Sequence, residues 1–146
     1  MLFKNDETSL RLDITSYEFP LDNGEPGSDD QNWLVIRATY TDEDGQHIKD
    51  SNACLLTYEL RELTAGLKVL NAGIRQRYDS DFAEPYFALS AAEEGEGFRA
   101  DVSFALPNTM EDIDTAEVEA LLTKEEMKSL IAELDRLCEK FPDRNG

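Results

Sequence analysis

Few side chains in this chain of 146 residues have the types and spacing that catalysis or metal binding requires. His47 is the only histidine, which excludes a histidine triad, a two-histidine metal site and the H-E-x-x-H motif. No glycine-rich loop with phosphate-binding spacing and no G-x-S-x-G nucleophile turn occurs. His47 follows a predicted hairpin tip, and we interpret it as a surface residue.

Two short acidic clusters lie at predicted turns. Asp42-Glu43-Asp44-Gly45 is similar to a calcium loop, but its acids miss the alternating ligand positions and no glutamate closes it. Glu93, Glu94 and Glu96 lie in a glycine-containing turn. Carboxylates that act as acid and base need burial or unequal environments, which a solvated turn does not provide. Both clusters are interpreted as turns.

Cys54 and Cys138 are the two cysteines, and both lie among apolar residues. A catalytic thiol needs an electropositive and partly exposed environment, whereas a buried free thiol behaves as a small hydrophobic side chain. One possible pair does not make a disulfide framework. We therefore predict no enzymatic activity, no metal and no cofactor. An enzyme stays as a third hypothesis, and it requires a concave pocket with convergent polar groups.

The charge balance is the most unusual property of the chain. It carries 32 acidic and 14 basic residues, a formal net charge of −18. Such a chain repels nucleic acid and anionic membranes and attracts cationic surfaces, so the charge predicts a basic protein as the partner. The alternative is that the charge serves solubility alone.

Length and hydropathy predict a single domain over residues 1–146, with loose ends at 1–8 and 143–146. The first seven residues lack the basic start and apolar run of a signal peptide, and no window reaches the 18 apolar residues of a membrane span. We expect a cytoplasmic protein that does not bind membranes and is a monomer or a weak homodimer.

Two amphipathic helices are predicted from apolar spacing. In the first, leucines recur every three or four residues from Leu56 to Leu70 and the pattern extends to Ile74. Thr57 is its predicted N-cap, and Gly73 is suited to the left-handed conformation that ends a helix. The second helix begins with the capping box of Thr123 and Glu126, and it ends before Pro142.

Strands are predicted from alternating apolar residues over 10–19, 32–42, 47–55, 84–90, 98–106 and 117–122. The apolar phase shifts after Ile14, which indicates a β-bulge. The polar stretch 22–30 and residues 107–114 are predicted loops. The predicted fold is α+β: an antiparallel sheet of about five to six strands with two helices on one face, in the order βββ-α-βββ-α.

One surface of this predicted sheet is a candidate for partner binding. Its outward side chains are expected to be Arg11, Asp13, Trp33, Val35, Arg37, Thr39, Arg99, Asp101 and Ser103. Trp and Arg are enriched at binding hot spots, and acidic loops favour a basic partner. The predicted partner-binding residues are Asp29, Asp30, Trp33, Arg37, Asp42, Glu43, Asp44, Glu93, Glu94 and Glu96.

Several segments together are similar to a known family. Tyr17-Glu-Phe-Pro20 precedes Asn32-Trp-Leu-Val-Ile-Arg37, and Cys54-Leu-Leu-Thr-Tyr-Glu-Leu60 opens the first helix. Glu84-Pro-Tyr-Phe87 and Glu139-Lys-Phe-Pro142 follow later. These segments resemble the WapI-type immunity proteins, small bacterial proteins, over about residues 9–142. The chain departs from the family pattern in having Tyr58 where tryptophan is most frequent and in its longer acidic loop before Asn32.

The resemblance implies an acidic binding protein that neutralises a cognate basic toxin, often a nuclease, by masking its active surface. The shared residues are core and helix-start positions, so no toxin-contacting residue is carried over from the family. Two alternatives stay open. One is a nucleic-acid mimic that inhibits a DNA- or RNA-binding protein, for which carboxylates are expected along one face at phosphate-like spacing. The other is a small domain without a toxin partner.

Overall fold

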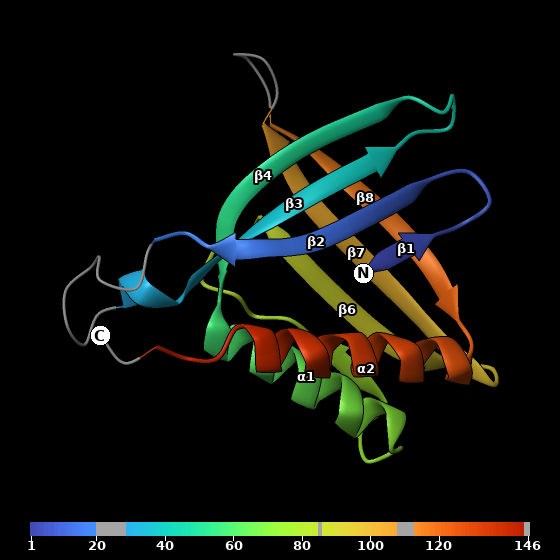
Figure 1. The fold of residues 1–146 in the computed structure, drawn as a ribbon. Helices are drawn as coiled ribbons and strands as arrows, with labels where there is room; N and C mark the ends of the chain where they lie inside the picture. Colours follow the sequence, from blue (N-terminus) through green and yellow to red (C-terminus); the bar gives the residue numbers. More distant parts are fainter. Residues whose placement is uncertain (20–28, 85, 108–112, 145–146) are drawn as a thin grey trace.

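The computed structural model describes residues 1–19, 29–84, 86–107 and 113–144. It combines two α-helices with strands in the order ββββ-α-ββββ-α (Figure 1). The elements are β1 (Leu2–Lys4), β2 (Ser9–Tyr17), the 3-10 helix η1 (Asp29–Asn32), β3 (Trp33–Thr41), β4 (His47–Leu56), α1 (Thr57–Asn71), β5 (Arg77–Asp79), β6 (Phe87–Glu94), β7 (Gly97–Pro107), β8 (Ile113–Leu122) and α2 (Lys124–Lys140).

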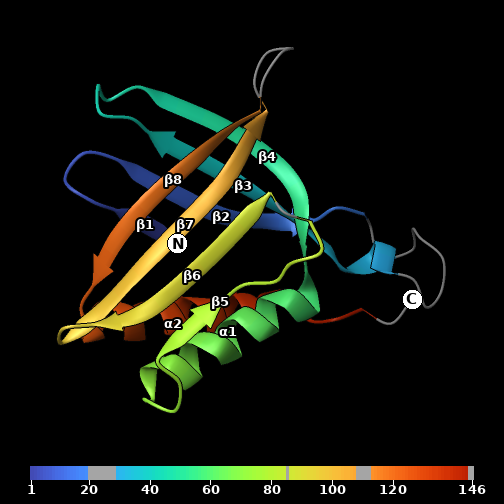
Figure 2. The same ribbon diagram turned by 180° about the vertical axis from the view of Figure 1, so that it is seen from behind.

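The described strands form two antiparallel four-stranded sheets, with the orders β1-β2-β3-β4 and β5-β6-β7-β8. The prediction of α+β is confirmed, but the prediction of one sheet of five to six strands is wrong. The strands of the two sheets cross at an angle, and α1 and α2 lie side by side along one edge of the pair (Figures 1 and 2). The inner faces of both sheets and the apolar faces of both helices enclose one core.

Strict alternation of side chains makes each sheet two-faced. In β2 and β3, Leu10, Leu12, Leu34 and Ile36 are buried, while the residues between them are partly or fully exposed. In β7 the buried residues are Phe98, Ala100, Val102, Phe104 and Leu106. The predicted bulge in β2 is confirmed, because the register with β3 shifts between Ile14 and Ser16.

Helix α1 begins one residue earlier than predicted, at Thr57. Its N-cap is Leu56, so the prediction of Thr57 as the cap is wrong. The side chain of Glu59 replaces a capping hydroxyl: its Oε1 accepts from the Leu56 N–H at 2.9 Å, and its Oε2 accepts from the Ala83 N–H at 2.7 Å. Gly73 ends the helix with φ of +77°, as predicted, and Ile74 therefore lies outside the apolar face, 75% exposed.

Helix α2 follows the prediction closely. The Thr123 hydroxyl accepts from the Glu126 N–H, and the Glu126 carboxylate accepts from the Thr123 N–H, each at 3.1 Å. Met127, Ile131 and Leu134 are buried against the sheets. The capping box was sufficient to locate this end because both bonds join residues three apart in sequence.

Four predictions about less regular segments need correction. Residues 1–8 are not a loose end, because β1 pairs with β2 and Phe3 is buried. Strand β5 lies between the first helix and the predicted strand 84–90, where no strand was predicted. Strand β6 runs from 87 to 94 instead of 84 to 90, and β8 begins at Ile113 instead of Glu117, which shortens the predicted loop 107–114.

The C-terminal residues 143 and 144 are held in place rather than loose. Asp143 forms an ion pair with Arg61. The backbone N–H of Arg144 donates to Asn32 Oδ1 at 2.7 Å, and its guanidinium lies 3.3 Å from the centre of the Tyr17 ring. Residues 145 and 146, and residues 20–28 of the predicted acidic loop, lie outside the described residues.

Gly66 provides the contact between α1 and β5. A Cβ atom at this position would overlap the Tyr78 ring. Replacing Gly66 with alanine gains about 1 kcal/mol in helix propensity and loses about 1–3 kcal/mol by overpacking. We expect a net loss of about 1 kcal/mol in the free energy of unfolding, measured with denaturant. In a Tyr78→Ala background the same substitution should stabilise instead, and an unchanged sign would contradict this contact.

We expect the protein to lose stability at alkaline pH because two buried groups, Cys54 and Tyr78, have raised pKa values. Burial, reinforced by Glu59, Glu84 and Asp50, raises the pKa of the Cys54 thiol from 9.0 to about 12. Burial and nearby carboxylates raise the pKa of Tyr78 from 10.0 to about 12. The unfolded chain therefore releases these protons at lower pH than the folded chain. The contribution of the two groups to the free energy of unfolding is complete below pH 9 and is lost toward pH 12.

The measurement is the free energy of unfolding at several pH values between about 8 and 11. The Cys54→Ala variant should show a shallower decrease than the unmodified protein. The comparison concerns the slope alone, since removing a buried sulfur also leaves a cavity. Equal slopes would show that Cys54 does not titrate differently in the two states.

Candidate functional site

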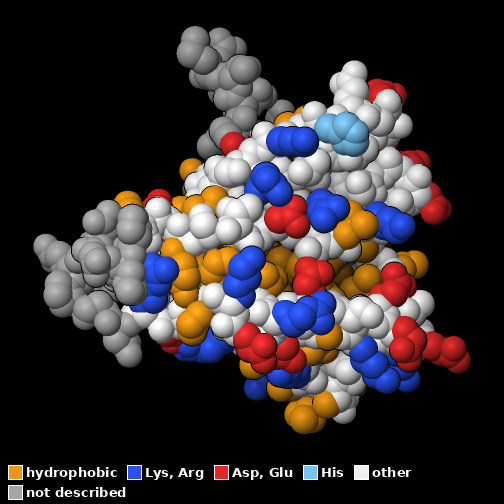
Figure 3. Space-filling view, in the orientation of Figure 1, with side chains coloured by type: hydrophobic (Ala, Val, Ile, Leu, Met, Phe, Trp, Pro, Cys, Tyr) orange, Lys and Arg blue, Asp and Glu red, His pale blue; other side chains and the backbone are white. Residues whose placement is uncertain are grey.

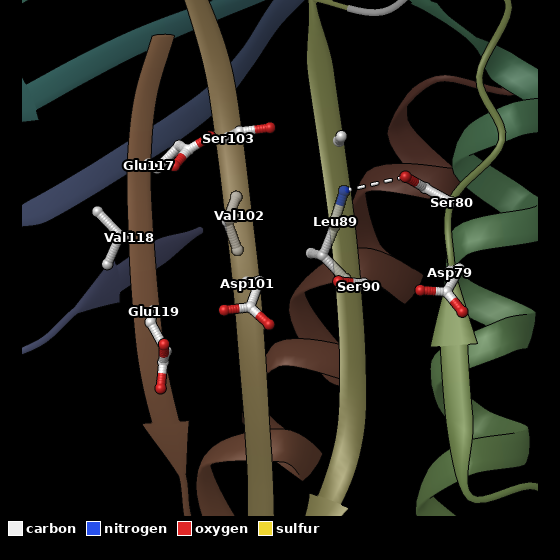
Figure 4. Close-up of a pocket in the computed structure, with 11 residues that line it drawn as sticks. Asp79, Ser80, Leu89, Ser90, Asp101, Val102, Ser103, Glu117, Val118 and Glu119 are labelled. Carbon is white, nitrogen blue, oxygen red and sulfur yellow. Dashed lines mark hydrogen bonds between the residues drawn. The ribbon is translucent and has the colours of Figure 1, made fainter.

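The outward side of the second sheet, β5-β6-β7-β8, is hollowed and acidic. A shallow hollow of about 580 Å³ lies over β5 to β8 (Figure 4). Four carboxylates line it together with serines that add hydroxyl groups. We call this surface the acidic face and define it by Asp79, Asp101, Glu117 and Glu119.

Strand register brings these carboxylates together from distant parts of the sequence. Asp79 pairs with Ser90, Ser90 with Asp101, and Asp101 with Glu119, which makes one row across all four strands. Figure 4 shows the side chains of Asp79, Asp101 and Glu119 along this row. Directly opposed residues on one face lie about 5 Å apart, so Asp101 and Glu119 are like charges in a destabilising position.

Two arginines partly compensate this repulsion. The Arg99 guanidinium lies 3.8 Å from the Asp101 carboxylate and 3.9 Å from the Glu119 carboxylate, and it also lies 3.7 Å from Glu94. Arg77 donates to Asp79 at 2.8 Å, and this hydrogen bond raises the pKa of the Arg77 guanidinium. One guanidinium shared among three carboxylates leaves a negative surface that an approaching cation would stabilise.

An exposed apolar side chain lies in the next row of the same sheet. Leu121 is directly opposite Arg99 and is 67% exposed. It borders a second hollow, of about 690 Å³, together with Glu94, Glu96 and Glu125. An apolar side chain surrounded by charged groups is typical of the centre of a protein-binding surface.

The structure separates the residues that were predicted to bind a partner. Trp33 and Arg37 lie on the outward side of β3 in the first sheet, β1-β2-β3-β4. Asp42, Glu43 and Asp44 form the β3–β4 turn, where the Asp42 carboxylate accepts from two backbone N–H groups at 2.9 Å. Asp29 and Asp30 belong to η1, and their side chains lie outside what the structure describes.

Glu93, Glu94 and Glu96 lie at the β6–β7 hairpin of the second sheet, and Glu94 and Glu96 border the hollow beside Leu121. The two acidic hairpins therefore belong to different sheets, and Figure 1 shows their tips apart. The predicted outward face is also divided, because Arg99, Asp101 and Ser103 lie on the second sheet and the other six residues lie on the first.

Asp79, Glu117, Glu119 and Leu121 were not predicted as site residues. The alternation Glu117, Glu119, Leu121 within the last strand was the signal for an outward row. Asp79 gave no such signal, because β5 has only three residues.

Within the described part of the chain, no group of three or more His, Cys, Asp or Glu side chains is arranged to hold a metal ion. No described helix has both the length and the apolar character needed to cross a membrane. The hollow beside the acidic face is open, and its side chains offer charge and hydrogen bonds to a partner surface.

No curated protein matches the chain. Among solved structures, WHY3 from Arabidopsis thaliana is similar with a TM-score of 0.54 and 16% identity, over 97% of this chain and 86% of that one. WHY1 from Arabidopsis thaliana is similar with a TM-score of 0.54 and 15% identity, over 97% and 88%. These likenesses concern the fold alone.

The sequence comparison is more specific. The family model described as the immunity protein WapI-like family matches residues 1–142, which is nearly the whole chain and agrees with the resemblance of its motifs. The chain therefore belongs to the immunity protein WapI-like family.

Proposed function

We propose that this protein is a cytoplasmic immunity protein that binds a basic toxin domain through its acidic face and masks the toxin's active surface. Membership of the family supports the immunity role. The observation that carries the choice of surface is the row of carboxylates across β5 to β8, in which Asp101 and Glu119 oppose each other. A toxin lysine or arginine placed between them removes this repulsion and gains charge-assisted hydrogen bonds.

A nuclease-type toxin suits this surface best. Nucleases hold phosphates with lysines and arginines, and a carboxylate row competes for the same groups. Long-range attraction between an acidic immunity protein and a cationic toxin also accelerates their encounter. Binding of this kind requires no catalysis by the immunity protein.

The nucleic-acid mimic is supported less well. Carboxylates do gather on one face, as that hypothesis expects. However, Arg77 and Arg99 lie in the adjacent row of the same face and form ion pairs with Asp79 and Glu119, and a phosphate backbone has no cations at such positions. The arginines indicate a surface matched to one partner that carries acidic groups among its cations.

The experiment pairs this protein with the toxin-like domain encoded by a neighbouring gene. Cells that express the toxin domain alone should stop growing, and cells that express both proteins should grow. The purified pair should form a nanomolar complex that weakens at about 0.5 M salt, where charge screening is strong. Growth arrest despite co-expression, or no complex at low salt, would contradict the proposed function.

Leu121 provides a separate prediction for the same complex. Leu121→Ala should weaken toxin binding about tenfold, because an apolar side chain beside desolvated charges is a typical hot spot. The control is Ile74→Ala, because Ile74 is even more exposed but lies beyond the end of α1, outside the second sheet. Binding should be measured by calorimetry for both variants. Equal affinities would place Leu121 outside the contact.

A further inference from the structure

The outward side of the first sheet has the opposite charge to the rest of this acidic protein. Outward side chains of β1 to β4 include four cations and one carboxylate, Asp13. We call this surface the basic face and define it by Lys4, Arg11, Arg37 and Lys49. Figure 3 shows Lys and Arg side chains gathered over these strands near His47, the only histidine.

Register again determines the grouping. Arg11 pairs with Thr39 and Thr39 with Lys49, so two cations lie in one row with a hydroxyl between them. Arg37 lies in the next row, opposite Asp13. Asp13 is close to both arginines, 3.3 Å from Arg11 and 3.7 Å from Arg37. These guanidiniums thus already engage a carboxylate, and each has further N–H donors for other acceptors.

The two charged faces lie on opposite sides of the molecule, because the sheets pack with their inner faces together. Both faces span a sheet of four strands, so their widths match at about 19 Å. The basic face presents hydrogen-bond donors, and the acidic face presents carboxylate acceptors. A second copy of this chain therefore carries a surface complementary in charge, width and hydrogen bonding to the basic face.

We infer that the protein self-associates head to tail, with the basic face of one copy on the acidic face of the next. Such a heterologous contact does not close on itself, so short open chains of copies form. The contact covers at most about 600 Å² on each copy, which is at the lower limit for specific interfaces and makes the association weak. Because it occupies the acidic face, a tightly binding toxin displaces it.

Salt dependence separates this contact from other kinds of association. Two copies each carry a charge of −18, and this repulsion acts across a screening length of about 30 Å at 0.01 M salt. At about 0.15 M salt the long-range repulsion is screened, while charges in contact still attract. At about 1 M salt the contacts are screened too. Association is therefore strongest at intermediate salt, whereas binding of a basic toxin weakens steadily as salt rises.

The test is analytical ultracentrifugation of the purified protein at concentrations up to about 1 mM, since the contact is weak. Arg37→Glu/Lys49→Glu reverses the basic face, and Asp101→Lys/Glu119→Lys reverses the acidic face. Each variant alone should associate at least about tenfold more weakly than the unmodified protein. An equimolar mixture of the two variants should regain association, because every contact between them joins opposite charges.

The control for the basic-face variant is Lys128→Glu/Arg136→Glu, which makes the same change in net charge as Arg37→Glu/Lys49→Glu but on exposed positions of α2, outside both faces. This control should associate more strongly than Arg37→Glu/Lys49→Glu, although the two variants carry the same net charge. A protein that stays monomeric at all salt concentrations would overturn the inference, and so would a mixture that fails to associate. A monomer that still protects cells from the toxin would overturn the inference while leaving the proposed function intact.

Discussion

Replacing Glu59 with alanine is expected to lower the free energy of unfolding by about 3 kcal/mol, because two backbone N–H groups lose their acceptor. Glu59 is only 3% exposed. One of its oxygens caps α1 at Leu56, and the other holds Ala83 in the segment between β5 and β6. The substitution leaves the buried Leu56 N–H without an acceptor, so the cost exceeds that of an ordinary surface cap.

The measurement is denaturant unfolding of three variants. Glu59→Gln keeps one acceptor oxygen and should lose about half as much as Glu59→Ala. Glu62→Ala, an exposed position on the same helix, should change the stability by less than about 0.5 kcal/mol. A similar loss for Glu59→Ala and Glu62→Ala would show that the two hydrogen bonds contribute little.

Reversing the charges of the acidic face is expected to weaken the toxin complex at least about 100-fold, or about 2.7 kcal/mol. In Asp101→Lys/Glu119→Lys, two lysines join Arg99 and repel the cations of the toxin. The association rate should fall more than the dissociation rate rises, because steering depends on the charge of the face. Stopped-flow or surface-based kinetics at about 0.15 M salt gives both rates.

The matched control is Glu43→Lys/Asp44→Lys, which makes the same change in net charge at the β3–β4 turn. This turn was a predicted partner contact from sequence, so the comparison also decides between the two surfaces. We expect the control to slow association only several-fold, through the change in overall charge. A larger loss for the control would identify the turn, rather than the acidic face, as the toxin contact.

Local features of the sequence were reliable where the interaction itself is local. The capping box of Thr123 and Glu126 located the start of α2, and the phase shift after Ile14 located the bulge in β2. Both features arise between residues a few positions apart, so the sequence carries them directly. The second role of Glu59 was not predictable in this way, since its other oxygen accepts from Ala83, 24 residues later in the chain.

The number of sheets was not predictable in the same way. Alternation in β2, β3 and β7 indicates which side chains are buried, but it does not indicate whether a helix or a second sheet covers them. Strands β1 and β5 are three residues long, too short for a period to be visible. Without them, the pattern fits a single sheet as well as two.

By itself, the sequence determined the net charge, the two helices, most strands and the family, because these follow from composition, periodicity and short motifs. Only the tertiary structure decided how the charge is distributed. Asp79, Asp101 and Glu119 come from three different strands and meet through register, which no local spacing records. Packing of the two sheets then turns the acidic and basic faces to opposite sides, because each sheet buries its apolar face against the other.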